Sequence, residues 1–224
     1  MGRRVAALTL DNVGDLPLPC RNCVSWELGT PGSDPTGKAD WLSAVLLDWG
    51  SCGRIVYVDG DVAGFAIYAP PEYVERMGMA ATSAISSDAV LLMTARVLPA
   101  HGAVGIGRVL IQSVVKDLLR RRGVKAIEAF GDVQGHDQAC VVPARFLTAV
   151  GFKTVQAHPR YPRMRLDLGN VVTWRDDVEV AIDRWLSAIR RDKAVSPAGL
   201  HARTEPTHDT SPANGGPASV QARP

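Results

Sequence analysis

The sequence predicts one α/β domain built on a mixed sheet of six or seven strands, with helices on both faces. Three observations predict this class. A hairpin of β-branched runs lies early in the chain, a nearly continuous apolar run follows it, and a glycine-rich turn joins that run to an amphipathic helix. The chain of 224 residues has room for one such domain with appendages.

The composition is that of a globular protein, with 46% hydrophobic and 21% charged residues. The formal net charge is only +2 and the longest basic block is Arg120–Arg122, so nucleic acid is not expected as a partner. The longest apolar run, residues 89–97, is far shorter than the roughly 20 residues of a membrane span, so no membrane is expected either. The N-terminus lacks the apolar stretch of a signal peptide, which predicts a cytoplasmic location.

The N-terminal part alternates short regular segments with turn-rich ones. Residues 5–10 have strand character, and the Asp, Asn, Gly and Pro residues after them predict an irregular path. Residues 29–37 are too rich in turn formers for regular structure. Apolar residues then recur at helical spacing from Trp41 to Trp49, which predicts an amphipathic helix that ends at Gly50.

A hairpin comes next, because Asp59-Gly60 separates two β-branched runs at residues 54–58 and 62–68. Residues 72–88 are uneven in character, and we expect a long loop that borders a binding site. Residues 89–98 are almost continuously apolar. This run predicts the central strand of the sheet, covered on both faces.

The second half of the domain begins with a glycine-rich turn, which leads into apolar positions at helical spacing over residues 109–119. The helix is expected to end at Gly123. Residues 125–130 predict another strand. Pro143 suits the first position of a short helix, which Gly151 ends. Two further strands are expected at residues 152–157 and 163–168.

The C-terminal part falls into two segments. Apolar residues at helical spacing from Trp174 to Ile189 predict an amphipathic helix that docks on the domain or on another subunit. After Arg191 the composition shifts to Pro, Ser, Thr, Ala and Gly, which is typical of disorder. The expected organisation is a domain over residues 1–170, a docked helix over 171–191 and a disordered tail over 192–224, and a homodimer through the helix stays an open alternative.

The informative motif joins the central strand to the helix after it. The strand ends at Val97-Leu98-Pro99, the turn contains Gly102, and the helix opens with Gly105-Ile106-Gly107-Arg108. Exposed N–H groups at a helix start, with glycines that allow close approach, suit a phosphate or pyrophosphate. A dinucleotide-binding fold would place this motif after its first strand, and a Walker loop would need Gly-Lys-Ser/Thr, so neither fits.

In this motif the sequence resembles the GNAT superfamily of acyl-CoA-dependent N-acyltransferases. Residues 146–152 resemble the family's later F-Y-x-x-x-G-F segment. Gly102 and Ala103 depart from the family's usual Arg or Gln and Gly, and Leu147 replaces a Tyr that commonly protonates the leaving CoA thiolate. The residues that match the central motif are Val97, Pro99, Gly105, Ile106, Gly107, Leu110 and Ile111.

The resemblance implies a sheet that splays between its fourth and fifth strands, with acetyl-CoA as cosubstrate in the gap. The implied reaction is direct transfer of the acetyl group, in a ternary complex, to a primary amine of a small molecule or a protein. Residues 16–28 and 49–54 look like a group of actinobacterial members of unsettled substrate, which leaves the acceptor open. The cofactor-binding residues implied are Val97, Leu98, Gly102, Ala103, Val104, Gly105, Ile106, Gly107 and Arg108.

Direct attack on the thioester needs a neutral amine, so a carboxylate, a histidine or a water chain must remove a proton. Glu128 is the first candidate base, because it lies on the strand beside the expected thioester, where partial burial would raise its pKa. The alternative is that Glu128 faces solvent or pairs with Arg or Lys. Asp88, Glu72 and His136 are further candidates in expected loops.

The four cysteines leave two interpretations open. Cys20-x-x-Cys23 has the spacing of a zinc or redox pair, and Cys52 and Cys140 could complete four thiolates. A second pair of this spacing is missing, so we expect no metal and interpret the isolated thiols as small buried apolar groups. Cys140 is also a candidate acid or acyl acceptor near the CoA sulfur.

Two other function classes remain alternatives to an enzyme. The missing Tyr and the altered Arg/Gln position motivate a non-catalytic acyl-CoA-binding sensor or interaction module that keeps the fold. The cysteines motivate a zinc-stabilised protein-interaction domain. Binding of CoA without acetyl transfer would favour the first alternative, and bound metal would favour the second.

Overall fold

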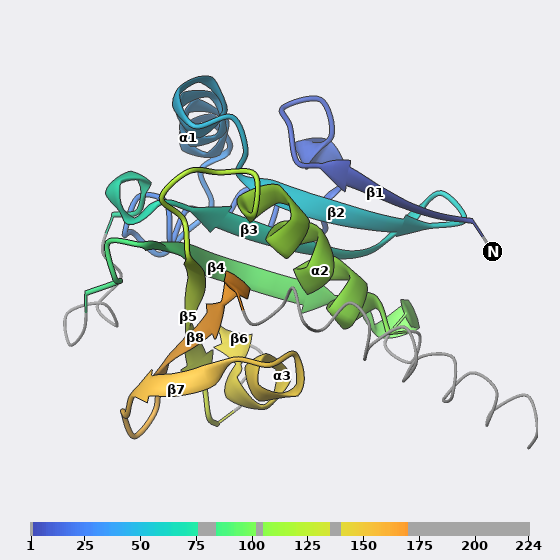
Figure 1. Ribbon diagram of the computed structural model, residues 1–224. Coiled ribbons are helices and arrows are strands. Elements are labelled where there is room, and N and C mark those ends of the chain that lie inside the picture. Colours follow the sequence, from blue (N-terminus) through green and yellow to red (C-terminus); the bar gives the residue numbers. More distant parts are fainter. Residues whose placement is uncertain (1, 76–83, 102–104, 135–139, 170–224) are drawn as a thin grey trace, which may run out of the picture. The chain divides into compact units, whose positions relative to one another are not determined.

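The computed structural model describes residues 2–75, 84–101, 105–134 and 140–169. In this part of the chain eight strands form one mixed sheet, with the order β1-β2-β3-β4-β5-β8-β7 and β6 paired to β5 (Figure 1). The α/β class is confirmed, and the sheet has one strand more than the six or seven expected. The strands are β1 (Arg3–Ala7), β2 (Gly53–Val58), β3 (Asp61–Ala69), β4 (Ala89–Val97), β5 (Ala126–Asp132), β6 (Val142–Pro143), β7 (Lys153–Gln156) and β8 (Arg163–Asp167).

The first helix, α1 (Pro35–Asp48), begins earlier than its apolar spacing indicates. The Asp34 side chain caps it by accepting a hydrogen bond from the Gly37 N–H at 2.9 Å, and Pro35 occupies the first turn. The expectation of irregular structure over residues 29–37 is therefore wrong from Pro35 onward. The reason is that Asp-Pro is a helix-start signal as well as a turn signal.

The hairpin of β2 and β3 is confirmed. Asp59 and Gly60 both have positive φ, 52° and 101°, as a two-residue turn that matches the strand twist requires. β3 then pairs antiparallel with β4, so the first four strands form an antiparallel half-sheet. This arrangement puts the apolar run of β4 at the centre of the sheet, as its composition predicts.

Helices cover both faces of the sheet (Figure 1). On one face α2 (Ile106–Leu118) and α3 (Ala144–Ala149) pack on apolar side chains such as Leu92 and Ile127. On the opposite face α1 and the segment between β1 and α1 pack on alternate residues of the same strands, such as Leu91 and Phe130. Within the described ranges there are also short 3-10 helices at Val13–Asp15, Pro71–Tyr73 and Pro99–His101.

Residues 170–224 lie outside the described residues, so the helix expected over 171–191 and the tail expected over 192–224 stay predictions. The same holds for a dimer contact through that helix. Among the helices that the structure describes, none combines the length and apolarity that crossing a membrane would take.

Candidate active site

β4 and β5 lie side by side for a short distance and then separate. Beyond this stretch β4 continues to Val97 and β5 to Asp132, and β5 pairs at its end with β6 instead. The splay between the fourth and fifth strands is therefore present, as the resemblance implies (Figure 1). The parallel pairs are Ala89 with Ala126, Val90 with Ile127 and Leu91 with Glu128.

A pocket of about 480 Å³ lies where the strands have parted. We call it the splay pocket. Its lining consists of residues 94–99 from the end of β4, residues 140, 141 and 143 around β6, Arg145 and Phe146 from α3, and residues 17 and 18. This volume is within the range of small-molecule sites. The wall carries two cationic side chains, Arg96 and Arg145, as a site for an anionic ligand would.

The backbone of Val97 faces the gap. The Leu98 N–H donates to the Ala63 carbonyl at 2.9 Å, on the β3 side. Because successive residues of an extended chain direct their N–H groups to opposite edges, the Val97 N–H points to the edge where β5 has departed. Val97 is therefore placed to donate to a ligand in the gap. The Leu98 N–H cannot donate to such a ligand because it is bonded to Ala63, and Leu98 contributes only by lining the pocket.

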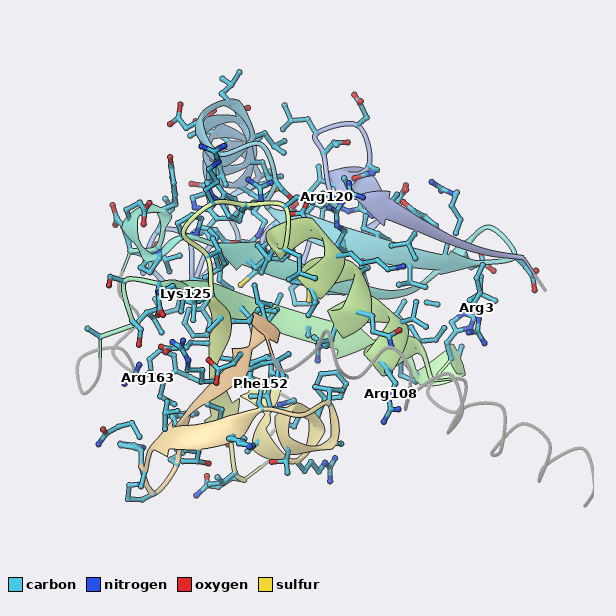
Figure 2. The ribbon with its side chains drawn as sticks, viewed as in Figure 1. Arg3, Arg108, Arg120, Lys125, Phe152 and Arg163 are labelled. Carbon is cyan, nitrogen blue, oxygen red and sulfur yellow. The ribbon has the colours of Figure 1, made fainter. Side chains whose placement is uncertain are left out.

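The N-terminal end of α2 lies next to the pocket lining, because Gly107 is packed against Phe146 and Val97. Gly105 is the residue before the helix and has φ +68°, in the left-handed region that glycine adopts without strain. Ile106 is 1% exposed and packs in the core below α2, so only its N–H is available to a ligand. Arg108 projects from the first turn (Figure 2). The implied contacts of residues 102–104 lie outside the described residues.

Gly107 has a packing role that its place in the motif does not show. A Cβ at this position would lie 2.5 Å from Cε2 of Phe146, so the glycine lets α3 pack against α2. Gly107→Ala is expected to lower the free energy of unfolding by about 2 kcal/mol, because the ring must shift. The loss should be smaller in a Phe146→Leu background, as measured by denaturant unfolding of the four chains. An equal loss in both backgrounds would contradict this packing role.

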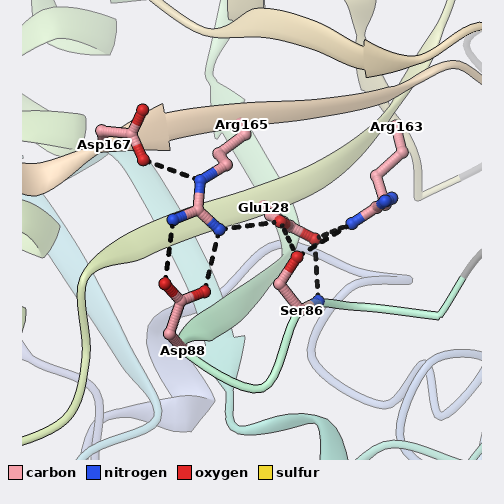
Figure 3. Close-up of polar contacts among 6 residues, drawn as sticks. All are labelled: Ser86, Asp88, Glu128, Arg163, Arg165 and Asp167. Atoms are coloured by element: carbon pink, nitrogen blue, oxygen red, sulfur yellow. Dashed lines mark hydrogen bonds and ion pairs between the residues drawn. The ribbon is translucent and has the colours of Figure 1, made fainter.

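Glu128, the predicted base, lies in a network of ions (Figure 3). It is 0% exposed. Its Oε2 accepts from Arg163 Nη1 at 2.6 Å and from the Ser86 N–H at 3.1 Å, and its Oε1 accepts from Ser86 Oγ at 2.7 Å and Arg165 Nη1 at 3.1 Å. Arg165 also pairs with Asp88 at 2.9 Å and with Asp167 at 2.7 Å. We call these six residues the Glu128 network.

The expected rise in the pKa of Glu128 is wrong. Burial raises it, but hydrogen bonds from Ser86, Arg163 and Arg165 outweigh burial, so the pKa lies below the ordinary 4.5. The physical reason is the strand register, which sets Arg165 directly opposite Glu128 and Arg163 opposite Phe130. A carboxylate held by two guanidinium groups is a weak base. Glu128 as the base stays a prediction, to which this geometry gives no support.

Of the other base candidates, the two that the structure describes, Asp88 and Glu72, do not line the splay pocket. Asp88 is bound by Arg165, whose hydrogen bond lowers the pKa of Asp88. Glu72 is an exposed residue of a 3-10 helix and does not line the pocket. His136 lies outside the described residues. Arg163 of the Glu128 network lies well apart from Arg108 at the start of α2 (Figure 2).

Leu147, which replaces the family's Tyr, is 0% exposed and packs in the core with Leu110 and Val142. Its side chain has no hydroxyl or other group that could give up a proton. Protonation of a leaving thiolate by this position is therefore ruled out on chemical grounds.

Three of the four cysteines gather beside the splay pocket, which the sequence spacing does not show. Cys140 lines the pocket, its sulfur lies 3.4 Å from that of Cys23, and it lowers the pKa of Cys20. Cys52 is buried elsewhere, with its Sγ 3.7 Å from the Leu8 carbonyl oxygen. Among the residues in the described ranges, no group of three or more His, Cys, Asp or Glu side chains is arranged to hold a metal ion.

The fold is similar to that of several solved acetyltransferase structures. An aminoglycoside acetyltransferase, AAC(6')-Ib, in complex with coenzyme A matches with TM-score 0.54 and 13% identity, over 78% of this chain and 99% of that one. The loading GNATL domain of CurA from Lyngbya majuscula matches with TM-score 0.51 and 12% identity, over 76% and 100%. An N-acetyltransferase from Staphylococcus aureus Mu50 matches with TM-score 0.50 and 13% identity, over 75% and 99%.

No protein-family model matches the chain, and no curated protein matches it. The structural likenesses, at these identities, establish the GNAT fold. The expected α/β class with a sheet splayed between its fourth and fifth strands is thereby confirmed.

Proposed function

We propose that the chain is an acetyl-CoA-dependent N-acetyltransferase that moves an acetyl group to a primary amine by direct transfer. The observation that carries this proposal is the splay pocket itself. It lies where β4 and β5 part, and the end of β4, whose Val97 N–H points into the gap, lines it. Gly107 in the first turn of α2 lies against Val97 and Phe146 of the lining, and the helix start has no side-chain cap. Acetyl-CoA needs these two features together, a slot for the thioester arm and amide donors for the pyrophosphate.

The cosubstrate is assigned to the gap in one orientation. The Val97 N–H would donate to the thioester carbonyl oxygen and stabilise the negative charge that develops there. The pyrophosphate would lie at the turn and first helical residues, where the helix dipole favours an anion. Arg96 and Arg145, on the pocket wall, would add positive charge. The turn comprises Gly102, Ala103 and Val104, followed by Gly105, Ile106, Gly107 and Arg108.

The acceptor is assigned to the class of primary amines, on a small molecule or a protein. An aminoglycoside acetyltransferase with the same fold supports a small polyamine as a first choice. A reducing compartment such as the cytoplasm is proposed, because four cysteines in a chain of this size are too few for a disulfide scaffold.

Proton transfers are assigned to water. The Glu128 network holds its carboxylates with arginines, so the amine must lose its proton to water in the open gap, or bind as the neutral form. The CoA thiolate that leaves takes a proton from water too, because Leu147 cannot supply one. We assign Glu128 a positioning role, in which it ties residues 86–88, ahead of β4, to β8.

A non-catalytic acyl-CoA-binding module is the second candidate, and the apolar Leu147 is the observation that favours it. One experiment separates the two candidates. The full chain is mixed with acetyl-CoA and a panel of primary amines, and free CoA thiol is measured over time beside calorimetric binding of acetyl-CoA.

Amine-dependent thiol release above the no-enzyme rate is expected. Binding without release for any amine would favour the module, and absence of binding would overturn both candidates.

A further inference from the structure

Cys23 and Cys140 are 117 positions apart in the chain, and their sulfur atoms are 3.4 Å apart. A disulfide has a sulfur–sulfur distance of about 2.05 Å, so the two sulfur atoms must approach by a little more than 1 Å for the bond to form. Both residues are half-buried, so small molecules can reach them. Cys140 also lines the splay pocket, which opens to solvent.

The backbone at each cysteine is held by a side chain from elsewhere in the chain. The Lys38 ammonium donates to the Cys23 carbonyl at 3.1 Å, and the same ammonium is ion-paired with Glu27 in the core. On the other side, Trp26 Nε1 donates to the Cys140 carbonyl at 3.3 Å. Because Trp26 follows Cys23 by three positions, one short segment carries the first thiol and anchors the second.

The surroundings divide the chemical roles between the two thiols. The hydrogen bond from Cys140 lowers the pKa of Cys23 to about 5 despite burial, with further help from Ser25 and Lys38. The neighbouring Cys20 and Cys23 raise the pKa of Cys140. The pKa of Cys20 is lowered as well, to about 6, by Cys140 and Arg96. With Cys140 as the thiol 3.4 Å from a more acidic Cys23, the pair has the arrangement of an attacking and a resolving cysteine.

We propose that Cys23 and Cys140 form an oxidisable pair, which a hydroperoxide converts to a reversible disulfide in the wall of the splay pocket. With hydrogen peroxide, the Cys23 thiolate attacks one oxygen, the O–O bond breaks, and Cys23 becomes a sulfenic acid, while the hydroxide that leaves takes a proton from solvent and becomes the first water. The Cys140 sulfur then attacks the Cys23 sulfur, the S–O bond breaks, and a second water carries away the Cys140 proton. Two thiols are oxidised by two electrons, and the peroxide is reduced to two waters.

Cys20 is a weaker partner for Cys140. Arg96 Nη1 donates to its sulfur at 3.4 Å, which favours the thiolate, but Cys20 is only 4% exposed, whereas Cys23 is half-buried. Hydroperoxide reaches Cys23 more easily. The Cys23–Cys140 pair is independent of the proposed function, because neither its oxidation nor the experiment below involves acyl-CoA.

The test is a tryptic peptide map of the oxidised protein, because cleavage after Arg21 puts Cys20 and Cys23 on different peptides. The four cysteines fall on four different tryptic peptides, residues 5–21, 22–38, 39–54 and 126–145. The full chain is reduced, freed of reductant, treated with one equivalent of hydrogen peroxide, alkylated, digested and examined by mass spectrometry. We expect peptides 22–38 and 126–145 to be linked, with the loss of two hydrogen atoms, and the other two peptides to be alkylated.

Variants supply the controls. Cys23→Ser and Cys140→Ser should each abolish this link, and Cys52→Ser should leave it intact because Cys52 is buried at another site. The wild-type peptide map decides the question even if a variant fails to fold. Three results would overturn the proposal: a link from peptide 5–21 to 126–145, over-oxidised Cys23 with no link, or purified protein that holds one equivalent of zinc on these thiols.

Discussion

Glu128→Gln is expected to lower the free energy of unfolding by about 3 kcal/mol near neutral pH, because it leaves two arginines without their shared buried anion. Glu128 is 0% exposed, whereas the side chains of Arg163 and Arg165 are 16% and 18% exposed. This partial exposure puts the loss at the lower end of the range for a broken buried pair. Denaturant unfolding of wild type and variant measures it.

Asp88→Asn is the matched control, since it removes a carboxylate from the same Arg165. The Asp88 side chain is 34% exposed, so its loss should cost less than about 1 kcal/mol. Equal losses for the two variants would contradict the central place of Glu128 in the network. A fall in acetyl transfer with no loss of stability would instead support Glu128 as the base.

The pH dependence of this stability has a definite sign. The pKa of Glu128 in the folded chain lies below its ordinary 4.5, so its contribution is fully present above 4.5. The contribution is lost as the pH falls through the lower folded-state pKa, because protonation then removes the same charge that the variant removes. The difference between wild type and Glu128→Gln should therefore shrink on acidification and stay constant around neutrality.

Gly105→Asp is expected to weaken acetyl-CoA binding roughly 100-fold, by placing a negative charge at the start of α2, where we assign the pyrophosphate. No atom lies within 4 Å of a Cβ built at Gly105, so the side chain has space. The φ of +68° is a backbone conformation that Asp and Asn tolerate better than other side chains. Calorimetric titration with acetyl-CoA measures the effect.

Gly105→Asn separates charge from strain, because it has the same shape and the same backbone demand without the charge. We expect it to bind acetyl-CoA within a few-fold of wild type. Equal weakening by Asp and Asn would mean that the backbone of the turn, and not an anion, matters at this position. Gly107→Asp is unsuitable as a probe, since the contact of Gly107 with Phe146 would disturb the packing of α3.

Much of the fold could be predicted because the signals are local. The Asp59-Gly60 hairpin, the apolar run of β4 and the amphipathic spacing of α2 each depend on a few neighbouring residues. β6 has only two residues and no hydrophobic pattern of its own, so the sequence does not predict it. It exists because β5 loses β4 as a neighbour and has backbone groups free to pair.

The candidate site was predicted less completely. Val97 and Gly105 lie where the motif indicates, at the gap and at the start of α2. The partners of Glu128 come from β8, which is distant in sequence, and they reverse the expected shift of its pKa. Charge in the sequence around Glu128 gives no hint of them, because cross-strand register has no local signature.

The sequence by itself determined the order of the elements, the glycine turn between β4 and α2, and the match that indicates an acyl-CoA site. These features follow from hydrophobic periodicity, turn chemistry and side-chain size, which depend only on residues close together in the sequence. Only the tertiary structure decided that Glu128 is held by two arginines, that Gly107 makes room for Phe146, and that the Cys140 sulfur lies 3.4 Å from that of Cys23. Each of these is a contact between distant segments, and its energy depends on distance and burial, which exist only once the chain has folded.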